Sequence, residues 1–405
     1  MKKTLQEFLD EFKINDEDDV VSERDDEEIH RIVNGVILLS YENAVLSYYA
    51  GMYYFYREGN GEMAEKYYLM GVDSGHVASM NCLACIYQGR GNLDLAEKYY
   101  TMAAEKGLVV AMFNLAVVYE EKSDFKLAEK YYLMAIEYSH INAMLNLGNL
   151  YFKKNDMLLA EKYYLMGVVN DDADAMFNLA NLYQEIEQFD LAEKYLKEAV
   201  ELGNVKAMNG LGCLLAAMNK GDEAIKYFVM AVGRDYVPAM HNLGCAYGIL
   251  GNGVLAEKYY LMAVEIGKDE DAMNNLGCLY EQQGKLELAE KYLIMAAAEG
   301  DDDSPLFNLG NLYWRSGNYL LGEKCFGRLV ERDHVAAMNS LGRLKEEIGE
   351  MEEAIRYYLM GVDWGNTDAM YNVANLYKKK GEVSLAELYY AMAIANDGDD
   401  DDLGE

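Results

Sequence analysis

The chain repeats itself every 32 residues over most of its length. A segment of the form Ala-Glu-Lys-Tyr-Tyr recurs with this spacing, for example at Ala64 and Ala96. A second segment, Ala-Met-x-Asn-Leu-Gly/Ala, recurs between these, and one extra residue enters the spacing before Ala272 and again before Pro305. About eleven such copies follow one another. A fixed period of this length predicts an array of stacked repeats instead of separate globular domains.

Each copy has the pattern of two amphipathic helices. Apolar residues recur at positions i, i+3, i+4 and i+7 in both halves of a copy, as on one buried helix face. In one copy these residues are Met112, Leu115, Ala116 and Tyr119 in the first half, and Ala128, Tyr131, Tyr132 and Ala135 in the second. A single helix pair cannot bury its apolar face alone, so neighbouring copies must stack.

Glycines recur between the two predicted helices of a copy. They come four residues after the aromatic residue, or its substitute, that closes the first helix. We expect them in the left-handed backbone conformation that ends many helices. These glycines are Gly91, Gly284, Gly317, Gly349 and Gly381.

The order of Leu, Gly, Tyr, Gly, Ala, Tyr and Ala within a copy resembles the tetratricopeptide repeat. The short join between copies, as in Ser74-Gly75-His76, is similar to that of Sel1-like repeats, but the long loop of typical Sel1-like repeats is missing. The resemblance covers residues 44–395. It implies an all-α fold, a right-handed α-solenoid of about eleven antiparallel helix pairs.

The two ends of the chain fall outside the repeats. Residues 1–28 combine a short amphipathic helix with an acidic linker, and residues 29–43 form a predicted capping helix. Residues 396–405 are acidic, and we predict a disordered tail there. Since no further polar helix follows the last copy, we expect its stacking face to promote self-association.

The formal net charge of the chain is −33. This field repels phosphates and anionic lipids, so it disfavours binding to nucleic acid or to a membrane surface. It attracts a partner with a basic patch, although acidity also serves solubility. No apolar run is long enough to span a bilayer, and Met1–Ile14 lacks the apolar stretch of a secretory signal. We therefore expect an intracellular, cytoplasmic protein.

The sequence predicts no catalytic, metal or cofactor site. Cys82 and Cys85 form a C-x-x-C pair without the second pair of a zinc site, and we interpret them as small, partly buried side chains. Three histidines, His76, His140 and His334, occupy one position in the joins between copies, and we interpret them as turn residues. We therefore predict that the chain is not an enzyme and takes no cofactor.

Asparagine recurs at one mid-helix position, although it is a mediocre helix former. We call these residues the ladder asparagines: Asn114, Asn146, Asn178, Asn242, Asn275, Asn308 and Asn372. The other four copies have Ala50, Cys82, Gly210 and Ser340 at this position. A second row lies three residues further along the same helix face: Asn149, Asn181, Asn311 and Asn375.

Two roles for the ladder asparagines are open. Their amides can bond neighbouring copies to each other, or they can hold the backbone of a bound peptide. The tetratricopeptide resemblance implies the second role, on a concave face, with binding concentrated on residues 111–181 and 242–311. Variable aromatic and apolar residues precede the ladder position and could supply specificity. Trp314 is a further candidate anchor, or it is partly buried under the next turn.

We predict a non-catalytic scaffold or adaptor that binds a peptide or partner protein on its concave face. One alternative is a regulatory or targeting subunit of an enzyme complex, which docks through the N-terminal helix with Phe8 and Phe12. An enzyme with a concealed site is a second alternative.

Overall fold

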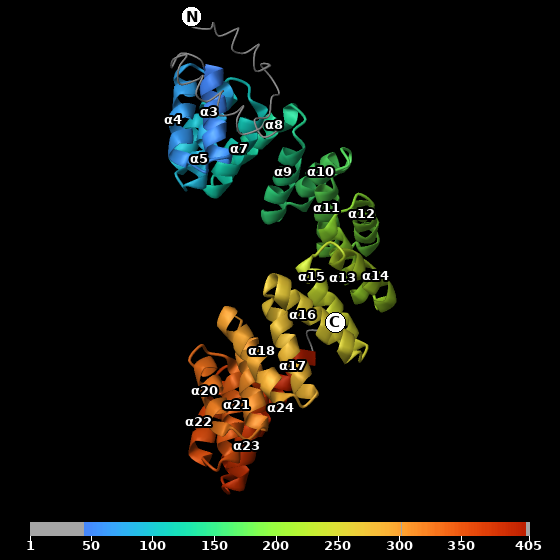
Figure 1. Cartoon of the computed structure of the whole chain (residues 1–405). Helices are drawn as coiled ribbons and strands as arrows, with labels where there is room; N and C mark the ends of the chain where they lie inside the picture. The colour runs from blue at the N-terminus through green and yellow to red at the C-terminus, as the bar shows by residue number, and fades with distance from the viewer. Residues whose placement is uncertain (1–43, 301, 402–405) are drawn as a thin grey trace, which may run out of the picture. The chain divides into compact units, whose positions relative to one another are not determined.

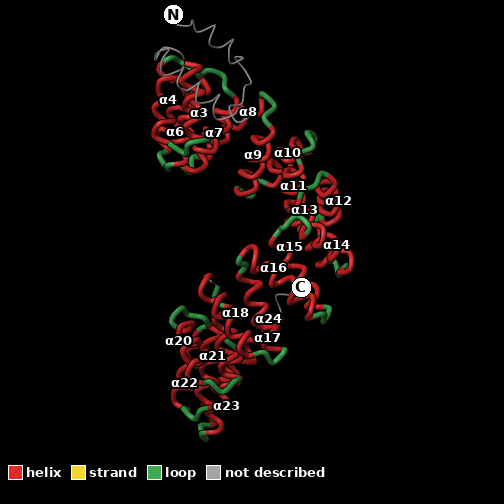
Figure 2. The backbone as a smooth tube through the Cα atoms, in the orientation of Figure 1, coloured by secondary structure: helices red, strands yellow, loops and turns green. Residues whose placement is uncertain are grey.

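The computed structural model describes residues 44–300 and 302–401. These residues form helices joined by short turns, with no strand in the described ranges (Figure 2). They divide into two compact units, whose boundary falls inside one helix, after Ala207. The segments predicted as an N-terminal amphipathic helix with linker (1–28) and as a capping helix (29–43) lie outside the described residues.

Within residues 44–207, the first unit contains five complete helix pairs, which follow one another in chain order (Figure 1). Its helices are α3 (Ala44–Tyr56), α4 (Gly61–Asp73), α5 (Val77–Gly89), α6 (Leu93–Glu105), α7 (Val109–Glu121), α8 (Phe125–Glu137), α9 (Ile141–Lys153), α10 (Met157–Val168), α11 (Ala173–Glu185) and α12 (Phe189–Glu201). Helix α13 (Val205–Ala217) begins in this unit and ends in the next.

The second unit continues the pattern to the end of the described chain. Its helices after α13 are α14 (Gly221–Val232), α15 (Val237–Ile249), α16 (Gly253–Gly267), α17 (Glu270–Gln282), α18 (Leu286–Glu299), α19 (Ser304–Arg315), α20 (Tyr319–Val330), α21 (Val335–Glu347), α22 (Met351–Asp363), α23 (Thr367–Lys379) and α24 (Val383–Asp401). The predicted all-α solenoid of eleven antiparallel helix pairs is thereby confirmed.

Short polar side chains set the helix starts, and left-handed residues set the ends. The side chains of Asn92 and Asp124 accept hydrogen bonds from backbone N–H groups three residues later, at 3.2 and 3.1 Å, which caps α6 and α8. The predicted left-handed turn glycines are confirmed, with φ between 73° and 90° at Gly91, Gly284, Gly317, Gly349 and Gly381.

Each helix pair is held together by a large side chain on a small one. In the pair α9 and α10, a Cβ atom on Gly148 would lie 2.5 Å from the ring of Tyr164, so only a glycine lets that ring pack so closely. Ala116, at the position in the pair α7 and α8 that corresponds to Gly148, and Ala128 on the second helix of that pair are fully buried. Small residues therefore set the distance between helices.

Hydrogen bonds from tyrosines link successive copies. The hydroxyl of Tyr119 on α7 donates to Glu97 Oε1 on α6, in the preceding copy, at 2.9 Å. The same bond recurs in both units. The further donor and acceptor pairs are Tyr87 to Glu65, Tyr183 to Glu161, Tyr280 to Glu257 and Tyr313 to Glu290.

Helix α24 ends later than the sequence indicates. It runs to Asp401 and so enters the segment 396–405 that we expect to be a disordered tail. Asn396 contributes to this extension, because its Nδ2 donates to Gly365 O at 3.0 Å and to Thr367 Oγ1 at 2.7 Å. Residues 402–405 lie outside the described residues.

None of the helices in the described ranges is both long and apolar enough to cross a membrane.

Candidate binding face

The ladder asparagines all lie on the first helix of a pair. Three of them belong to α7, α9 and α11 in the first unit, and four belong to α15, α17, α19 and α23 in the second. All seven side chains are half-buried, and each precedes a fully or nearly fully buried core residue, as Asn114 precedes Leu115. The helix pairs thus hold the amides in a fixed row along each unit.

Most ladder asparagines donate a hydrogen bond to the preceding copy. In four cases the Nδ2 atom donates to the Oδ1 of an asparagine that belongs to neither row, at 2.9 to 3.2 Å. These acceptors immediately precede the ladder position of their own copy, a site we call the flanking position. The pairs are Asn114 to Asn81, Asn242 to Asn209, Asn308 to Asn274 and Asn372 to Asn339.

The other three ladder asparagines find different partners. Asn275 Nδ2 lies 2.9 Å from Nε2 of His241, which occupies the flanking position. Asn178 donates to Asn149 of the second row at 2.8 Å, and Asn146 lies 3.4 Å from the hydroxyl of Tyr132. The ladder therefore has a structural role as a chain of bonds between copies.

The amide oxygens of the ladder asparagines differ from their nitrogens in their hydrogen bonding. Within the described residues, no hydrogen bond is donated to the Oδ1 atom of any ladder asparagine. An amide oxygen has two lone pairs and accepts readily from N–H groups. Each unit thus presents a row of acceptors, held in place by the donor side of the same amides.

The second-row asparagines differ from one another. Asn149 Oδ1 accepts from Tyr164 OH at 2.8 Å, and the exposed Asn375 accepts from Tyr390 OH at 2.6 Å. Asn181 and Asn311 are half-buried and make no hydrogen bond to another described residue. Asn149 and Asn375 thus accept hydrogen bonds within the described chain, and Asn181 and Asn311 are available to a ligand.

Trp314 lies beside a cavity of about 520 Å³ whose lining includes Asn311 and Arg343. Its indole Nε1 donates to Glu347 Oε2 at 2.7 Å, and the guanidinium of Arg343 lies 4.9 Å from its ring centroid. The side chain is half-buried, which agrees with the alternative of partial burial. Contacts to the next copy hold the ring at the edge of this cavity.

The flanking asparagines are site residues that the sequence reasoning missed. Asn81, Asn209, Asn274 and Asn339 each accept a ladder bond, yet we grouped this position only as variable. The sequence contains a signal for them. Each stands one residue before the ladder position of its own copy, and the next copy has a ladder asparagine.

The join histidines have a definite role. Nδ1 of His76, His140 and His334 accepts the backbone N–H three residues later, at 3.2, 3.3 and 3.1 Å, so each ring caps the following helix. Burial lowers the pKa of His76 and His140, which favours the neutral ring that such a cap requires.

The six cysteines are free thiols, and burial raises the pKa of Cys82 to about 11. Cys245 differs. Burial raises the pKa of its thiol, but the contact with His241 and the hydrogen bond from the Tyr260 hydroxyl outweigh burial, and the pKa lies below the ordinary value. Within the described residues, no three His, Cys, Asp or Glu side chains lie close enough together to hold a metal ion.

The chain matches tetratricopeptide repeat families at residues 83–142, 173–202, 271–298 and 307–365. Its fold is similar to that of a protective antigen of uropathogenic Escherichia coli with an SLR fold, at 20% identity and a TM-score of 0.53, over 91% of this chain and 94% of the other. A Sel1 repeat protein from Oxalobacter formigenes is similar at 17% identity and a TM-score of 0.52, over 73% and 98%. No curated protein sequence matches the chain.

The two structural likenesses have low sequence identity, so they bear on the fold alone. The repeat-family matches fall on helix pairs in both units and agree with the 32-residue copies of the sequence. The chain is therefore a Sel1-like, tetratricopeptide-like repeat protein.

Proposed function

We propose that this protein is a non-catalytic scaffold that holds an extended peptide segment of a partner protein along the ladder face. Repeat folds of this kind generally serve protein–protein interaction and carry no catalytic site. The row of Oδ1 atoms that accept no bond within the described residues carries the proposal. An extended peptide offers backbone N–H groups in a regular row, and amide oxygens are suitable acceptors for them.

The flanking residues supply the side-chain preference in this proposal. Phe113, Phe177 and Phe307 are half-buried beside the ladder, so their rings offer apolar contact area there. His140 stacks on Phe113 at 4.7 Å and His334 stacks on Phe307 at 5.4 Å, which fixes these rings further. We place the binding stretches at residues 111–181 and 242–311.

Charge narrows the class of partner. With a formal net charge of −33, the chain attracts basic segments over long range and repels nucleic acids and anionic membranes. We therefore propose a peptide with lysine or arginine residues, in an intracellular setting. Binding should weaken as salt is raised, because the attraction between exposed charges is screened.

A pair of matched variants tests the proposal. Asn308→Ala and Asn274→Ala both remove the same 2.9 Å bond between α19 and α17, so both should lower the free energy of unfolding by about 0.5–1.5 kcal/mol. Only Asn308→Ala also removes a ladder Oδ1 atom. The probe is a phage-displayed library of random peptides selected on the full chain.

We expect the selected basic peptides to lose affinity for Asn308→Ala and to keep it for Asn274→Ala. Equal loss in both variants would show that the ladder acts on stability alone. Failure to enrich any peptide on the unchanged chain would also contradict the proposal.

A further inference from the structure

Most copies contain a stacked pair of tyrosines, one from each of their two helices. The tyrosine that closes the first helix stacks on the first tyrosine of the second helix, with ring centroids 5.5 to 5.7 Å apart. The seven pairs are Tyr87 with Tyr99, Tyr119 with Tyr131, Tyr151 with Tyr163, Tyr183 with Tyr195, Tyr247 with Tyr259, Tyr280 with Tyr292, and Tyr377 with Tyr389.

A lysine covers the second ring in six of these pairs. Its Nζ lies 4.7 to 5.1 Å from the ring centroid, within the range of a cation–π interaction. This lysine is the one that precedes the tyrosine in the Ala-Glu-Lys-Tyr-Tyr segment, as Lys98 precedes Tyr99. The second ring is therefore held between a tyrosine and an ammonium group.

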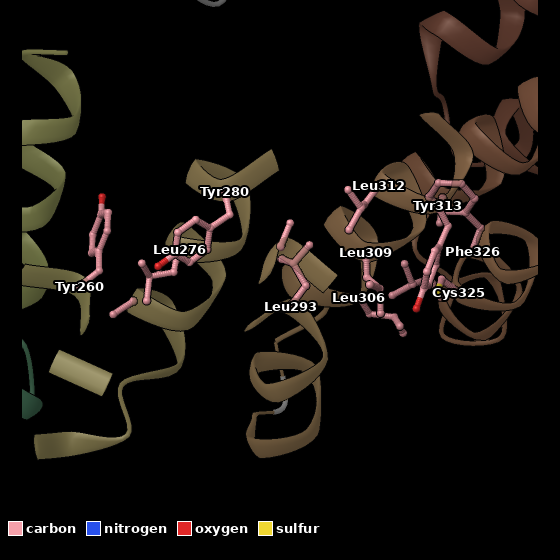
Figure 3. Packing of buried hydrophobic residues seen from close by; sticks show 14 of the residues in the cluster. Tyr260, Leu276, Tyr280, Leu293, Leu306, Leu309, Leu312, Tyr313, Cys325 and Phe326 are labelled. Carbon is pink, nitrogen blue, oxygen red and sulfur yellow. The ribbon is translucent and has the colours of Figure 1, made fainter. Parts of the chain in front are cut away.

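The copy formed by α19 and α20 lacks that second ring. Cys325 stands where the other ten copies have tyrosine, although both partners of the ring, Tyr313 and Lys324, are present. Arg328 is a second departure in the same helix, at a position where nine copies have methionine. Figure 3 shows Tyr313 on α19 with Cys325 and Phe326 of α20 beside it.

A cavity of about 610 Å³ lies at this place, between α18, α19 and α20. Tyr313, Lys324, Cys325 and Arg328 line it, together with apolar side chains that include Leu306. Its volume lies within the range of small-molecule sites, about 300–1,000 Å³. The cavity thus occupies the place of the missing ring and has one cation more than the regular copies.

The two cations at this cavity are available for a ligand. Lys324 and Arg328 are exposed and form no ion pair with another described residue, although the chain is strongly acidic. The inner part of the cavity is apolar, since Leu306 and Leu309 are only 7% and 6% exposed. Burial raises the pKa of Cys325 to about 11, so its thiol is neutral and does not repel an anion.

We propose that this cavity binds a small aromatic carboxylate. The ring takes the place of the absent tyrosine, where it stacks on Tyr313 and lies beneath Lys324. The carboxylate then pairs with the guanidinium of Arg328, which suits such a group. None of the ladder asparagines lines the cavity, so this inference is independent of the proposed peptide binding.

Calorimetric titration of the full chain with two compounds tests the proposal. 4-Hydroxyphenylacetate and tyramine share the phenol ring of tyrosine, but the first carries a carboxylate and the second an ammonium group. We expect 4-hydroxyphenylacetate to bind with a dissociation constant of about 1 mM, as its size suggests. Tyramine should bind more weakly, although the net charge of −33 favours it at any non-specific site.

Two variants that restore the residues of regular copies complete the test. Cys325→Tyr fills the cavity, so it should abolish binding and raise the melting temperature. Arg328→Met should weaken binding of 4-hydroxyphenylacetate by about tenfold and leave tyramine almost unaffected. Should Cys325→Tyr fail to fold, Arg328→Met still decides. No saturable binding to the unchanged chain at about 10 mM, or unchanged binding in Arg328→Met, overturns the proposal.

Discussion

The hydrogen bond of a ladder asparagine depends on which acceptor the preceding copy provides for its amide N–H group. Where the flanking residue of that copy is asparagine or histidine, the N–H group has a direct acceptor, as Asn275 has His241. Gly210 and Ser340 replace the ladder asparagine, and the copies before them have phenylalanine at the flanking position. Asn146 also follows a copy with phenylalanine at the flanking position, and it donates instead to the hydroxyl of Tyr132, at 3.4 Å. Gly210 and Ser340 thus stand where the preceding copy has no acceptor at the flanking position.

The histidine caps give a prediction at the residue scale. Since burial holds the pKa of His76 and His140 below 6.5, the unfolded chain binds protons more readily than the folded one. Their contribution to stability is complete above the unfolded pKa and is lost as pH falls through the folded value. We expect the melting temperature to drop between about pH 7.5 and pH 5.5.

A matched variant isolates this contribution. Asn366 caps α23 with the same geometry, at 2.7 Å, and does not titrate. The double variant His76→Asn and His140→Asn should therefore show a flatter dependence of melting temperature on pH. An unchanged slope would mean that other groups cause the drop.

Within a helix pair, the residue in the left-handed conformation between the two helices is the main local determinant of the turn. Seven copies place glycine there, but others use Ser123 (φ 61°), Asn155 (φ 59°) and Glu187 (φ 60°). This conformation is unfavourable by about 1–2 kcal/mol for residues with a Cβ atom, and by less for asparagine. The turns of the first unit therefore contain strain that glycine would remove.

Glycine substitutions at these turns test that reasoning. Ser123→Gly and Glu187→Gly should each raise the free energy of unfolding by about 0.5–1 kcal/mol, because relief of strain exceeds the added freedom of the unfolded chain. Asn155→Gly is the control and should have little effect. Chemical denaturation followed by circular dichroism measures all three, and a loss of stability in Ser123→Gly would contradict the prediction.

Sequence periodicity could predict these elements because it reports burial directly. The helix pairs, their turns and the core alanines all follow from residues that recur every 32 positions. Partners that lie in different copies are harder to predict, because the bond from Tyr119 to Glu97 joins residues 22 apart with no local signal. The cavity beside Cys325 depends on a residue that is absent from one copy, which a search for recurring residues passes over.

At the scale of the whole molecule, each copy is stabilised by its neighbours. Val362 on α22 is only 9% exposed because the following helix pair covers it, whereas the equivalent Ile394 on α24 is 65% exposed. Leu388 on α24 is also half exposed and replaces the lysine of the regular segment. Within the described residues, no further helix pair covers this apolar surface.

We expect that surface to associate with a second copy of the chain. Light scattering at micromolar concentration should give a mass above that of one chain, and Ile394→Lys should return the mass to that of one. Leu320→Lys, at an exposed apolar residue of α20, is the control and should leave the mass unchanged. A single-chain mass for the unmodified protein would contradict the prediction.

The amide bonds of the ladder all run in one direction, from a copy to the one before it. The copy formed by α17 and α18 carries both a donor, Asn275, and an acceptor, Asn274, and it stands between the acceptor His241 and the donor Asn308. Duplicating this copy places Asn275 after Asn274, and deleting it places Asn308 after His241, so every ladder bond keeps an acceptor. Deleting the copy of Asn339 would instead place Asn372 after Phe307, which offers no acceptor. The ladder can thus lengthen or shorten by gene duplication in steps of one copy, at seams where a flanking asparagine or histidine meets a ladder asparagine.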